Sequence, residues 1–406
     1  MVRQITLLKA REVLAAVLAL AVFLPGFAFG ASADTPRIVV IGEVQSAANT
    51  VRSFLEHVEL IDAEANWTGG NSILIQTGDF MDDGEHVRAT LDLFMRLQKE
   101  AEAAGGQVIV LMGNHEALNI MGDCRWVNYM AYESFKGPDS EQLQLEAWEA
   151  WVAWRQKRAS SLGEGFEPTA EVKAEWFALH PPGWAEYAES MRPAGVYGAW
   201  LRTLPVAVVI DDVLFVHSAI SPELETMGVE ELNRRAAEEI KYFDDHREFM
   251  VTAGLGLPTS SILELVEVVK QEVEFINGLK ASKRTKDNPR VAQMLQVQDL
   301  SKCGDWIILD KNGPLYFTGE ARWLEEEFGG QLAHILDAQG IKRIVTGQSD
   351  GKHRLVQSRF DDRVVLTSIG MSDDPYAGGG KPAALEILNY DYFVVSLDGR
   401  ELLIDN

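Results

Sequence analysis

The sequence contains little cysteine, and its basic residues are far fewer than its acidic residues. Its two cysteines, Cys124 and Cys303, are too few for a disulfide-rich scaffold. In an exported protein they could form one disulfide, and two free thiols are equally compatible with the sequence. Lysine and arginine number 37 against 61 aspartate and glutamate, a formal net charge of −24. This deficit argues against non-specific binding to nucleic acid and against docking on an anionic membrane surface, because both require clustered cations.

The sequence also has no internal repeat, low-complexity tract or clear linker. Hydrophobic residues make up 47% of the chain, enough for a sizeable core. The length of 406 residues allows one large domain or two ordinary ones. We expect one domain over 34–406, with helical insertions at about 130–192 and 229–298.

Basic residues precede an apolar run near the amino terminus. Arg3, Lys9 and Arg11 are followed by apolar residues over about 13–24, and Ala-Ser-Ala at 31–33 fits the A-x-A cleavage pattern. The run is shorter than the roughly 20 residues of a comfortable membrane span. We therefore predict a signal peptide over 1–33 and an exported protein, periplasmic or secreted, with no stable membrane anchor after cleavage. An uncleaved anchor is the alternative.

Short apolar runs alternate with helical patterns in the first third of the chain. Strands are predicted at 37–42, 72–76 and 107–112, with helices at about 48–60 and 87–104 between them. This alternation predicts an α/β fold with parallel strands. Further strands are predicted at 206–210, 213–217, 343–346, 363–367, 384–388 and 392–397. Trp148, Trp151 and Trp154 recur at helical spacing, which favours a buried helix face over an aromatic substrate wall.

Five polar segments each follow a predicted strand, where open α/β sheets place their sites. They are Gly42-Glu43-Val44-Gln45, Gly78-Asp79-Phe80-Met81-Asp82-Asp83-Gly84, Gly113-Asn114-His115-Glu116, Val216-His217-Ser218-Ala219-Ile220 and Gly347-Gln348-Ser349. In order and approximate spacing the series resembles that of the calcineurin-like metallophosphoesterases, G-D-x-H, G-D-x-V-D-R-G, G-N-H-E, V-H-G-G-I and G-H-T. The resemblance implies a four-layer αββα fold, a β-sandwich flanked by helices, here with helical insertions.

Other segments resemble the bacterial Shewanella-like branch of the phosphoprotein phosphatases. Asn119, Gly122-Asp123 and Arg125 follow the third motif, and Tyr197-Gly198-Ala199-Trp200-Leu201-Arg202 resembles the Y-G-x-W-L-R segment of that branch. A C-terminal signature is similar over 370–386. The resemblance extends over about residues 37–400.

The resemblance implies a role for each matching residue. Asp79 corresponds to the carboxylate that bridges two divalent cations, and Asn114 and His217 to ligands of the second cation. His115 corresponds to the general acid or electrostatic stabiliser, supported by Asp82. In such a site the cations polarise the phosphoryl oxygen and acidify a water for in-line attack. Arginines hold the phosphate, and Arg125 and Arg202 are the candidates here.

Several positions depart from the family pattern. Glu43 replaces an aspartate ligand, whereas Gln45 and Gln348 replace histidine ligands with neutral amides. Imidazole suits zinc, iron and manganese, whereas amide oxygen suits calcium or magnesium and binds less tightly. Asp83 stands at the substrate-binding position of an arginine, which reverses the local charge. Asp350 could bind the first metal instead, and His353 could replace a lost imidazole.

Smaller departures occur in the later motifs. Ser218 and Ala219 replace two glycines, and Ser368 stands where an aspartate is expected. We therefore expect a degraded dinuclear centre that holds one divalent ion or none, with Mn, Fe, Zn, Mg or Ca as candidates. The chain is then a pseudophosphatase or a very weak phosphoesterase. The alternative is an active metal-dependent phosphatase with altered metal preference, acting on a phosphorylated small molecule or a phosphoprotein. A third alternative is a structural envelope protein of unrelated fold.

The signal peptide predicts the amino terminus of the mature protein. N-terminal sequencing of natively expressed protein should give Asp34 or a residue close to it, because cleavage after Ala33 fits the pattern of small residues. Recovery of a form that retains Met1 from the soluble cytosol would contradict export.

Overall fold

The computed structural model describes residues 35–82, 84–348, 355–371 and 381–405. The predicted signal peptide, Asp83, Asp350 and His353 lie outside these residues. All the secondary structure described below belongs to one compact unit, Pro36–Asn406. Cys124 and Cys303 are both free, so they do not form the disulfide that the sequence allowed.

The first sheet has six strands in the order β11-β10-β9-β1-β2-β3. Strands β1 (Ile38–Ile41), β2 (Ile73–Gln76) and β3 (Gln107–Val110) are parallel, with Ile38 opposite Ile73 and Ile73 opposite Gln107. The C-terminal strands β9 (Ala383–Leu388), β10 (Asp391–Ser396) and β11 (Gly399–Ile404) are antiparallel to their neighbours.

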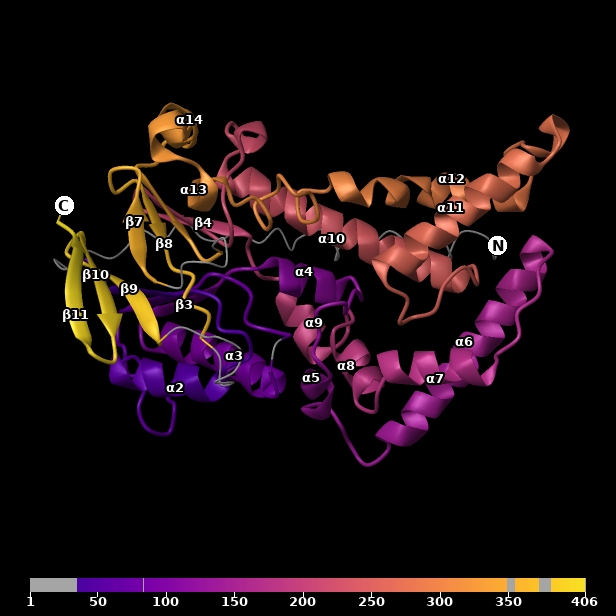
Figure 1. The fold of residues 1–406 in the computed structure, drawn as a ribbon, viewed down its shortest axis with the longest axis horizontal. Helices are drawn as coiled ribbons and strands as arrows, with labels where there is room; N and C mark the ends of the chain where they lie inside the picture. Colours follow the sequence, from indigo (N-terminus) through magenta and orange to yellow (C-terminus); the bar gives the residue numbers. More distant parts are fainter. Residues whose placement is uncertain (1–34, 83, 349–354, 372–380, 406) are drawn as a thin grey trace, which may run out of the picture. The chain divides into compact units, whose positions relative to one another are not determined.

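The second sheet has five strands in the order β4-β5-β6-β8-β7. They are β4 (Ala207–Ile210), β5 (Val213–Val216), β6 (Arg343–Thr346), β8 (Val364–Leu366) and β7 (Gln357–Arg359). Strands β5, β6 and β8 are parallel, whereas β4 and β7 pair antiparallel at the edges. The two sheets lie face to face (Figure 1).

Alternate side chains of each strand enter two different cores. Ile38 and Val40 of β1 pack with Phe215 of β5 and Val345 of β6 between the sheets. Val39 and Ile41 of the same strand point outward, into the core beneath the helices. Both faces of these strands are therefore buried, which explains why they are continuous apolar runs in the sequence.

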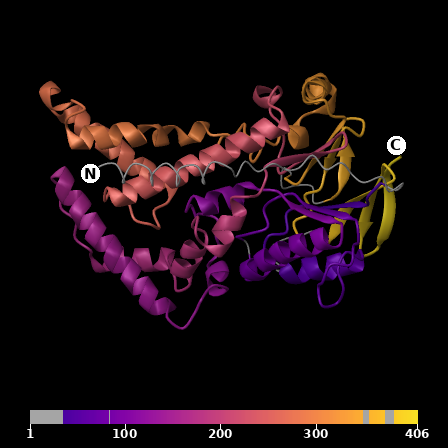
Figure 2. The same ribbon diagram turned by 180° about the vertical axis from the view of Figure 1, so that it is seen from behind.

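Helices cover the outer face of each sheet. Helices α2 (Ala48–His57) and α3 (Val87–Ala103) pack on the first sheet, and α10 (Val229–Thr252) and α14 (Glu325–Gln339) on the second (Figures 1 and 2). The αββα architecture expected from the sequence is confirmed. Helix α3 at 87–103 and strand β6 at 343–346 agree closely with the predicted helix and strand. Strands β7 and β11 and helix α14 were not predicted.

Two long helical stretches interrupt this architecture. The first contains α4 (Asn114–Ile120), α5 (Tyr129–Glu133), α6 (Ser140–Leu162), α7 (Ala170–Leu179), α8 (Trp184–Ser190) and α9 (Val196–Leu201). Trp148 of α6 is buried, stacks on Trp151 and contacts Trp176, so the tryptophans form a packed aromatic cluster. The second stretch contains α10, α11 (Ile262–Gly278) and α12 (Pro289–Val297); a short α13 (Gly319–Arg322) follows. Among the described residues, no helix is long and apolar enough to span a bilayer.

A buried ion triad joins the two helical stretches. Glu272 of α11 accepts hydrogen bonds from Arg158 of α6 and from Arg290 of α12. The side chains of Glu272 and Arg158 are only 1% and 4% exposed. Burial acts to raise the pKa of Glu272, but the two arginines lower it below its ordinary value. The carboxylate is thus held ionised between the two stretches.

Removing this carboxylate charge should destabilise the fold. Glu272→Gln leaves a buried guanidinium without a counter-ion, which typically costs about 3–5 kcal/mol. Urea unfolding followed by circular dichroism should show the loss in the free energy of unfolding. Glu231→Gln, which breaks an exposed pair with Arg234 on α10, is the matched control and should leave the unfolding midpoint nearly unchanged. Equal midpoints for the two variants would show that the triad contributes nothing.

Candidate functional site

The described residues of the five polar segments meet at one edge of the sandwich. The backbone N–H groups of Val44 and Gln45 donate to the carbonyl oxygen of Asp79 at 3.2 Å. Across the sandwich, the carbonyl oxygen of His217 accepts from the N–H groups of Gly347 at 3.0 Å and Gln348 at 2.7 Å. Loops that are far apart in the sequence are therefore bonded backbone to backbone.

Glu116 fixes the loops after β2 and β3 together. Its carboxylate is fully buried and accepts from the backbone N–H groups of Asp79 at 2.9 Å, Phe80 at 3.0 Å and Gly113 at 2.8 Å. Burial raises its pKa to about 7. These bonds hold Asp79 in the left-handed conformation, with a φ of 56°, that turns its side chain toward the site.

Gly78 is needed for the close approach of these loops. Its φ is +94°, a conformation that side chains rarely allow. A Cβ atom there would lie 2.7 Å from His217 Nδ1 and 2.8 Å from the Cα of Gly113. Any other residue would therefore push β2 away from both neighbouring motifs.

Asp79, Asn114 and His217 converge on one point. The side-chain NH₂ group of Asn114 donates to both carboxylate oxygens of Asp79 at 3.0 Å and lies 3.2 Å from His217 Nε2. His217 Nε2 is also 3.4 Å from Asp79 Oδ2. His217 is fully buried, and its Nδ1 lies 2.8 Å from the carbonyl oxygen of Thr77. When the ring is neutral with its proton on Nδ1, this proton is donated to the Thr77 carbonyl oxygen and Nε2 faces the other two groups, the usual arrangement of a metal-binding histidine.

The field at this point is negative. Burial raises the pKa of Asp79, but the neighbouring His217 and His115 rings lower it to about 2. Burial conversely lowers the pKa of His217, whereas the charges of Asp79 and Glu43 raise it to about 9. A field that attracts a proton this strongly to an imidazole also attracts a metal cation.

His115 and Asp82 form the pair expected from the sequence. His115 Nδ1 is 2.9 Å from Asp82 Oδ2, and its Nε2 faces Asp79 Oδ2 at 3.8 Å. Burial acts to lower the pKa of His115, but Asp79 and Asp82 raise it to about 10. The imidazole is therefore held as a cation and remains 24% exposed. Its ring also packs on Trp126, with centroids 4.9 Å apart.

Asp82 is itself held by buried hydrogen bonds. Asn119 Nδ2 donates to Asp82 Oδ1 at 2.6 Å and to the His115 carbonyl oxygen at 2.9 Å. The Tyr187 hydroxyl donates to Asn119 Oδ1 and lies 3.3 Å from Asp82 Oδ1. No motif in the sequence points to Tyr187, because it lies on α8 in the first helical stretch, 68 residues after Asn119. Only the packing of α8 on α4 reveals it.

The positions that depart from the family pattern lie at the rim of this centre. Glu43 is half-buried and its charge acts on His217. Gln45 is also half-buried, with a φ of 42°. The side-chain oxygen of Gln348 is buried and has no hydrogen-bond partner among the described residues. An amide oxygen in that state suits a cation, so Gln348 fits a weak metal ligand.

Three candidate metal-binding groups converge in the structure. Asp79, Asn114 and His217 supply a carboxylate, an amide and an imidazole, with Gln348 at the edge. Within the described residues, no group of three or more histidine, cysteine, aspartate or glutamate side chains could hold a metal ion. The roles predicted for Asp83 and Asp350 lie outside the described residues and stay predictions.

The two arginines proposed for substrate binding differ in their surroundings. Arg125 is 47% exposed and its guanidinium donates to Asp123. Arg202 is 13% exposed and donates to Asp244 and to the carbonyl oxygens of Met191, Gly198 and Ile120. These bonds join α9 to α10, and they include none of the predicted metal ligands. Substrate binding by either arginine stays a prediction.

Ser218 occupies its position without disturbing the loop. It is 1% exposed, and its hydroxyl donates to the carbonyl oxygen of Phe317. Its backbone N–H donates to the Pro314 carbonyl oxygen at 3.1 Å. The hydroxyl that replaces a glycine hydrogen therefore has its own hydrogen-bond partner.

Solved structures share this fold. The crystal structure of a cold-active protein-tyrosine phosphatase from a psychrophilic Shewanella species matches with a TM-score of 0.55 and 19% identity, over 91% of this chain and 80% of that chain. A further structure of a cold-active protein tyrosine phosphatase, at 1.1 Å, matches with a TM-score of 0.52 and 21% identity, over 91% of this chain and 79% of that one. At these identities the likeness shows the fold alone.

Relatives are also found by sequence. Shewanella-like protein phosphatase 2 of Arabidopsis thaliana is 28% identical over 218 residues, which cover 52% of this chain and 53% of that protein. Shewanella-like protein phosphatase 1 of Plasmodium berghei is 24% identical over 205 residues, 50% of this chain and 45% of that protein. The chain spans about half the length of the curated relatives it matches.

The sequence model of the calcineurin-like phosphoesterases matches residues 36–347. This span is well over half of the 406 residues, and it runs from just before β1 to the glycine that follows β6. It contains the convergent Asp79, Asn114 and His217 and the His115–Asp82 pair. Because this match covers well over half of the chain, the chain belongs to the calcineurin-like phosphoesterase family.

Proposed function

We propose that this chain is an exported phosphoesterase-family protein that holds at most one divalent cation tightly, and whose phosphoester hydrolysis is very weak or lost. The proposal rests on the set of side chains that could bind a metal ion. Asp79, Asn114 and His217 converge, whereas the other two histidine positions of the family hold the amides of Gln45 and Gln348. The function would then be that of a pseudophosphatase, a binding or regulatory module.

The residues that remain define what such a site can do. A bound cation, among Mn, Fe, Zn, Mg and Ca, would supply charge stabilisation to a phosphoryl oxygen. Asp79, Asn114 and His217 would hold it, with Gln348 as a weaker ligand. His115, as an imidazolium, would stabilise negative charge on the departing oxygen or protonate it. With one cation instead of two, less charge stabilisation is available to the reaction than in a two-metal site.

An active metal-dependent phosphatase with altered metal preference is the second candidate. The intact network of His115, Asp82, Asn119 and Tyr187 favours it, because these buried bonds position a general acid. The names of the relatives, protein phosphatases, agree with this candidate. Its substrate would be a phosphomonoester or a phosphoprotein.

Export is part of the proposal and is supported by the sequence alone. The basic residues before the apolar run and the small residues at 31–33 are the support. Removal of 1–33 would leave the site unchanged, since every residue assigned to it lies after position 42.

Metal content discriminates the two candidates. We expect purified mature protein to retain at most one equivalent of divalent metal after exhaustive dialysis, measured by inductively coupled plasma mass spectrometry. His217→Ala should remove that equivalent, because it deletes the buried imidazole ligand. His246→Ala on α10 is the matched control, because the two ring nitrogens of His246 lie beside the backbone carbonyl oxygens of Tyr242 and Gln296 and its ring stacks on Tyr242. Two equivalents in the parent would support the active phosphatase, and Asp350→Asn would then be the next variant to examine.

Restoring the family residues should restore hydrolysis. The variant Glu43→Asp, Gln45→His, Asp83→Arg and Gln348→His rebuilds the ligands and the phosphate clamp. Loaded with manganese, it should hydrolyse an aryl phosphate far faster than the parent, whereas single reversions should do little because such residues act as a unit.

Adding His115→Asn to that quadruple variant is the control. It should abolish most of the gain, because stabilisation of the leaving group is lost. A parent already as fast as the quadruple variant would refute the loss of activity. A quadruple variant that binds two metals without any gain would instead locate the defect in the substrate pocket.

A further inference from the structure

A cavity of about 170 Å³, which we call the tryptophan cavity, lies where the first helical stretch meets the segment that leads into α11. It is lined from helices α6, α7 and α8 by Ala147, Trp151, Trp176 and Trp184, together with residues 257–260. None of the residues assigned to the metal centre lines it. An apolar cavity of about 150 Å³ accommodates benzene, so the tryptophan cavity has room for one small aromatic molecule.

His180 contributes an unpaired acceptor to the lining of this cavity. Its Nδ1 lies 2.7 Å from the carbonyl oxygen of Trp176, and its ring stacks on the Trp176 indole with centroids 4.2 Å apart. Burial lowers the pKa of His180 below its ordinary value, although the bond to the Trp176 carbonyl oxygen acts to raise it. The imidazole is therefore neutral at neutral pH, and its one proton belongs on Nδ1, because a carbonyl oxygen only accepts. Nε2 is left as an acceptor, and no described residue donates to it.

Trp176 adds an unpaired donor on the ring that stacks against this acceptor. The residue is 5% exposed, and its indole Nε1 is buried without a hydrogen-bond partner in the part of the chain that the structure describes. A buried donor without a partner costs free energy, so such groups are uncommon. A hydroxyl group donates one hydrogen bond and accepts others, so a single ligand oxygen can serve both rings.

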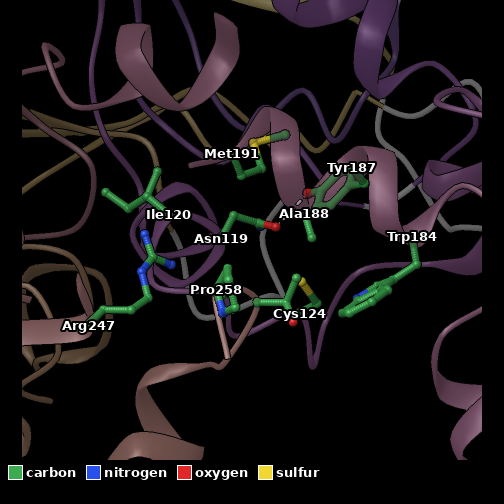
Figure 3. Close-up of a pocket in the computed structure, with 11 residues that line it drawn as sticks. Asn119, Ile120, Cys124, Trp184, Tyr187, Ala188, Met191, Arg247 and Pro258 are labelled. Carbon is green, nitrogen blue, oxygen red and sulfur yellow. Dashed lines mark hydrogen bonds between the residues drawn. The ribbon is translucent and has the colours of Figure 1, made fainter. Parts of the chain in front are cut away.

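A second, smaller cavity adjoins the tryptophan cavity. Trp184 and Pro258 line both cavities, and the smaller one is also lined by Asn119, Cys124 and Tyr187 (Figure 3). Its volume of about 20 Å³ holds about one water and admits no organic ligand. An aromatic ligand is therefore confined to the tryptophan cavity and does not reach the side chains that hold Asp82.

The charges around the cavity favour a neutral ligand. Glu264 of α11 belongs to its lining, so an anion would meet a like charge in a chain whose formal charge is already −24. The Arg155 guanidinium lies 5.7 Å from the centroid of the Trp151 ring, so a positive charge already lies against this aromatic wall. An organic cation would be repelled by that guanidinium, which opposes a cation–π contact with the same ring. A neutral molecule avoids both repulsions.

We propose that the tryptophan cavity binds a small neutral aromatic molecule that carries one hydroxyl group, a simple phenol. Its ring packs among the indoles of Trp151, Trp176 and Trp184, which provide a large apolar contact area. Its hydroxyl donates to His180 Nε2 and accepts from the indole N–H of Trp176. The ligand thus provides hydrogen-bond partners for two groups that the described chain leaves unpaired.

Ligand-observed NMR on the mature protein tests the proposal, with phenol as probe and fluorobenzene as a ligand of similar shape without a hydroxyl group. Phenol should bind saturably with a Kd on the order of 1 mM, as expected for a ligand of this size. Fluorobenzene should bind roughly three to ten times more weakly, because it donates no hydrogen bond. His180→Phe keeps a ring in the wall and removes the acceptor. This variant should lose the preference for phenol and keep the Kd for fluorobenzene nearly unchanged.

A second variant tests the location of the ligand and remains informative if His180→Phe does not fold by circular dichroism. Ala147→Met on α6 fills part of the cavity and should abolish binding of both ligands. Ala153→Met, at an exposed position of the same helix outside the lining, is the matched control and should leave both Kd values unchanged.

Four results would overturn the proposal. They are no saturable binding of phenol, equal affinity of the parent for phenol and fluorobenzene, unchanged binding in Ala147→Met, and tighter binding of benzoate or tetramethylammonium than of phenol. None of these readouts depends on metal binding or phosphoester hydrolysis.

Discussion

The buried carboxylate of Glu116 holds the two central loops of the site in register. It bonds three backbone N–H groups that belong to segments more than 30 residues apart, those of Asp79, Phe80 and Gly113. Neither the sheet nor the helices could supply these acceptors, because the three N–H groups lie beyond the ends of β2 and β3. With Asp79 fixed in a left-handed conformation, its carboxylate meets both Asn114 and His217, and its charge sets the pKa of the two neighbouring histidines. The electrostatics of the whole centre follow from this one anchor.

Most of the architecture could be predicted from the sequence, because its strands are buried on both faces. A continuous apolar run such as Ile38–Ile41 is too short for a buried helix, and the polar motif that follows it marks where the strand ends. Strand β7 was missed because Gln357–Arg359 is short, polar and half-buried, so it carries no alternation. Strand β11 was missed because Gly399–Ile404 lies at a sheet edge, where exposure removes the apolar pattern.

Some residues of the site could be identified from the sequence, and others could not. Residues within motifs, such as Asp79, Asn114, His115 and His217, could be identified because strand ends bring them together. Tyr187 and Trp126 could not, since both reach His115 or its partner Asp82 only through the packing of the first helical stretch. Arg202 lies in a segment resembling the family, yet its bonds to Asp244 and three carbonyl oxygens show a side chain used in tertiary packing. A motif match predicts where a residue lies in the fold, but it does not show with which groups the side chain forms hydrogen bonds.

The pairing of β1 with β9 has a consequence for how the chain reaches this structure. Ile38 lies opposite Ile387, so the central strand of the first sheet has one neighbour from each end of the chain. Such a contact closes a loop of almost the entire protein, and loop closure of that length slows folding. Until β9 arrives, one edge of β1 is open, with a row of valine and isoleucine side chains beside unpaired backbone groups. Such an edge is a template for association between chains, so the chain is exposed to aggregation until β9 pairs with β1.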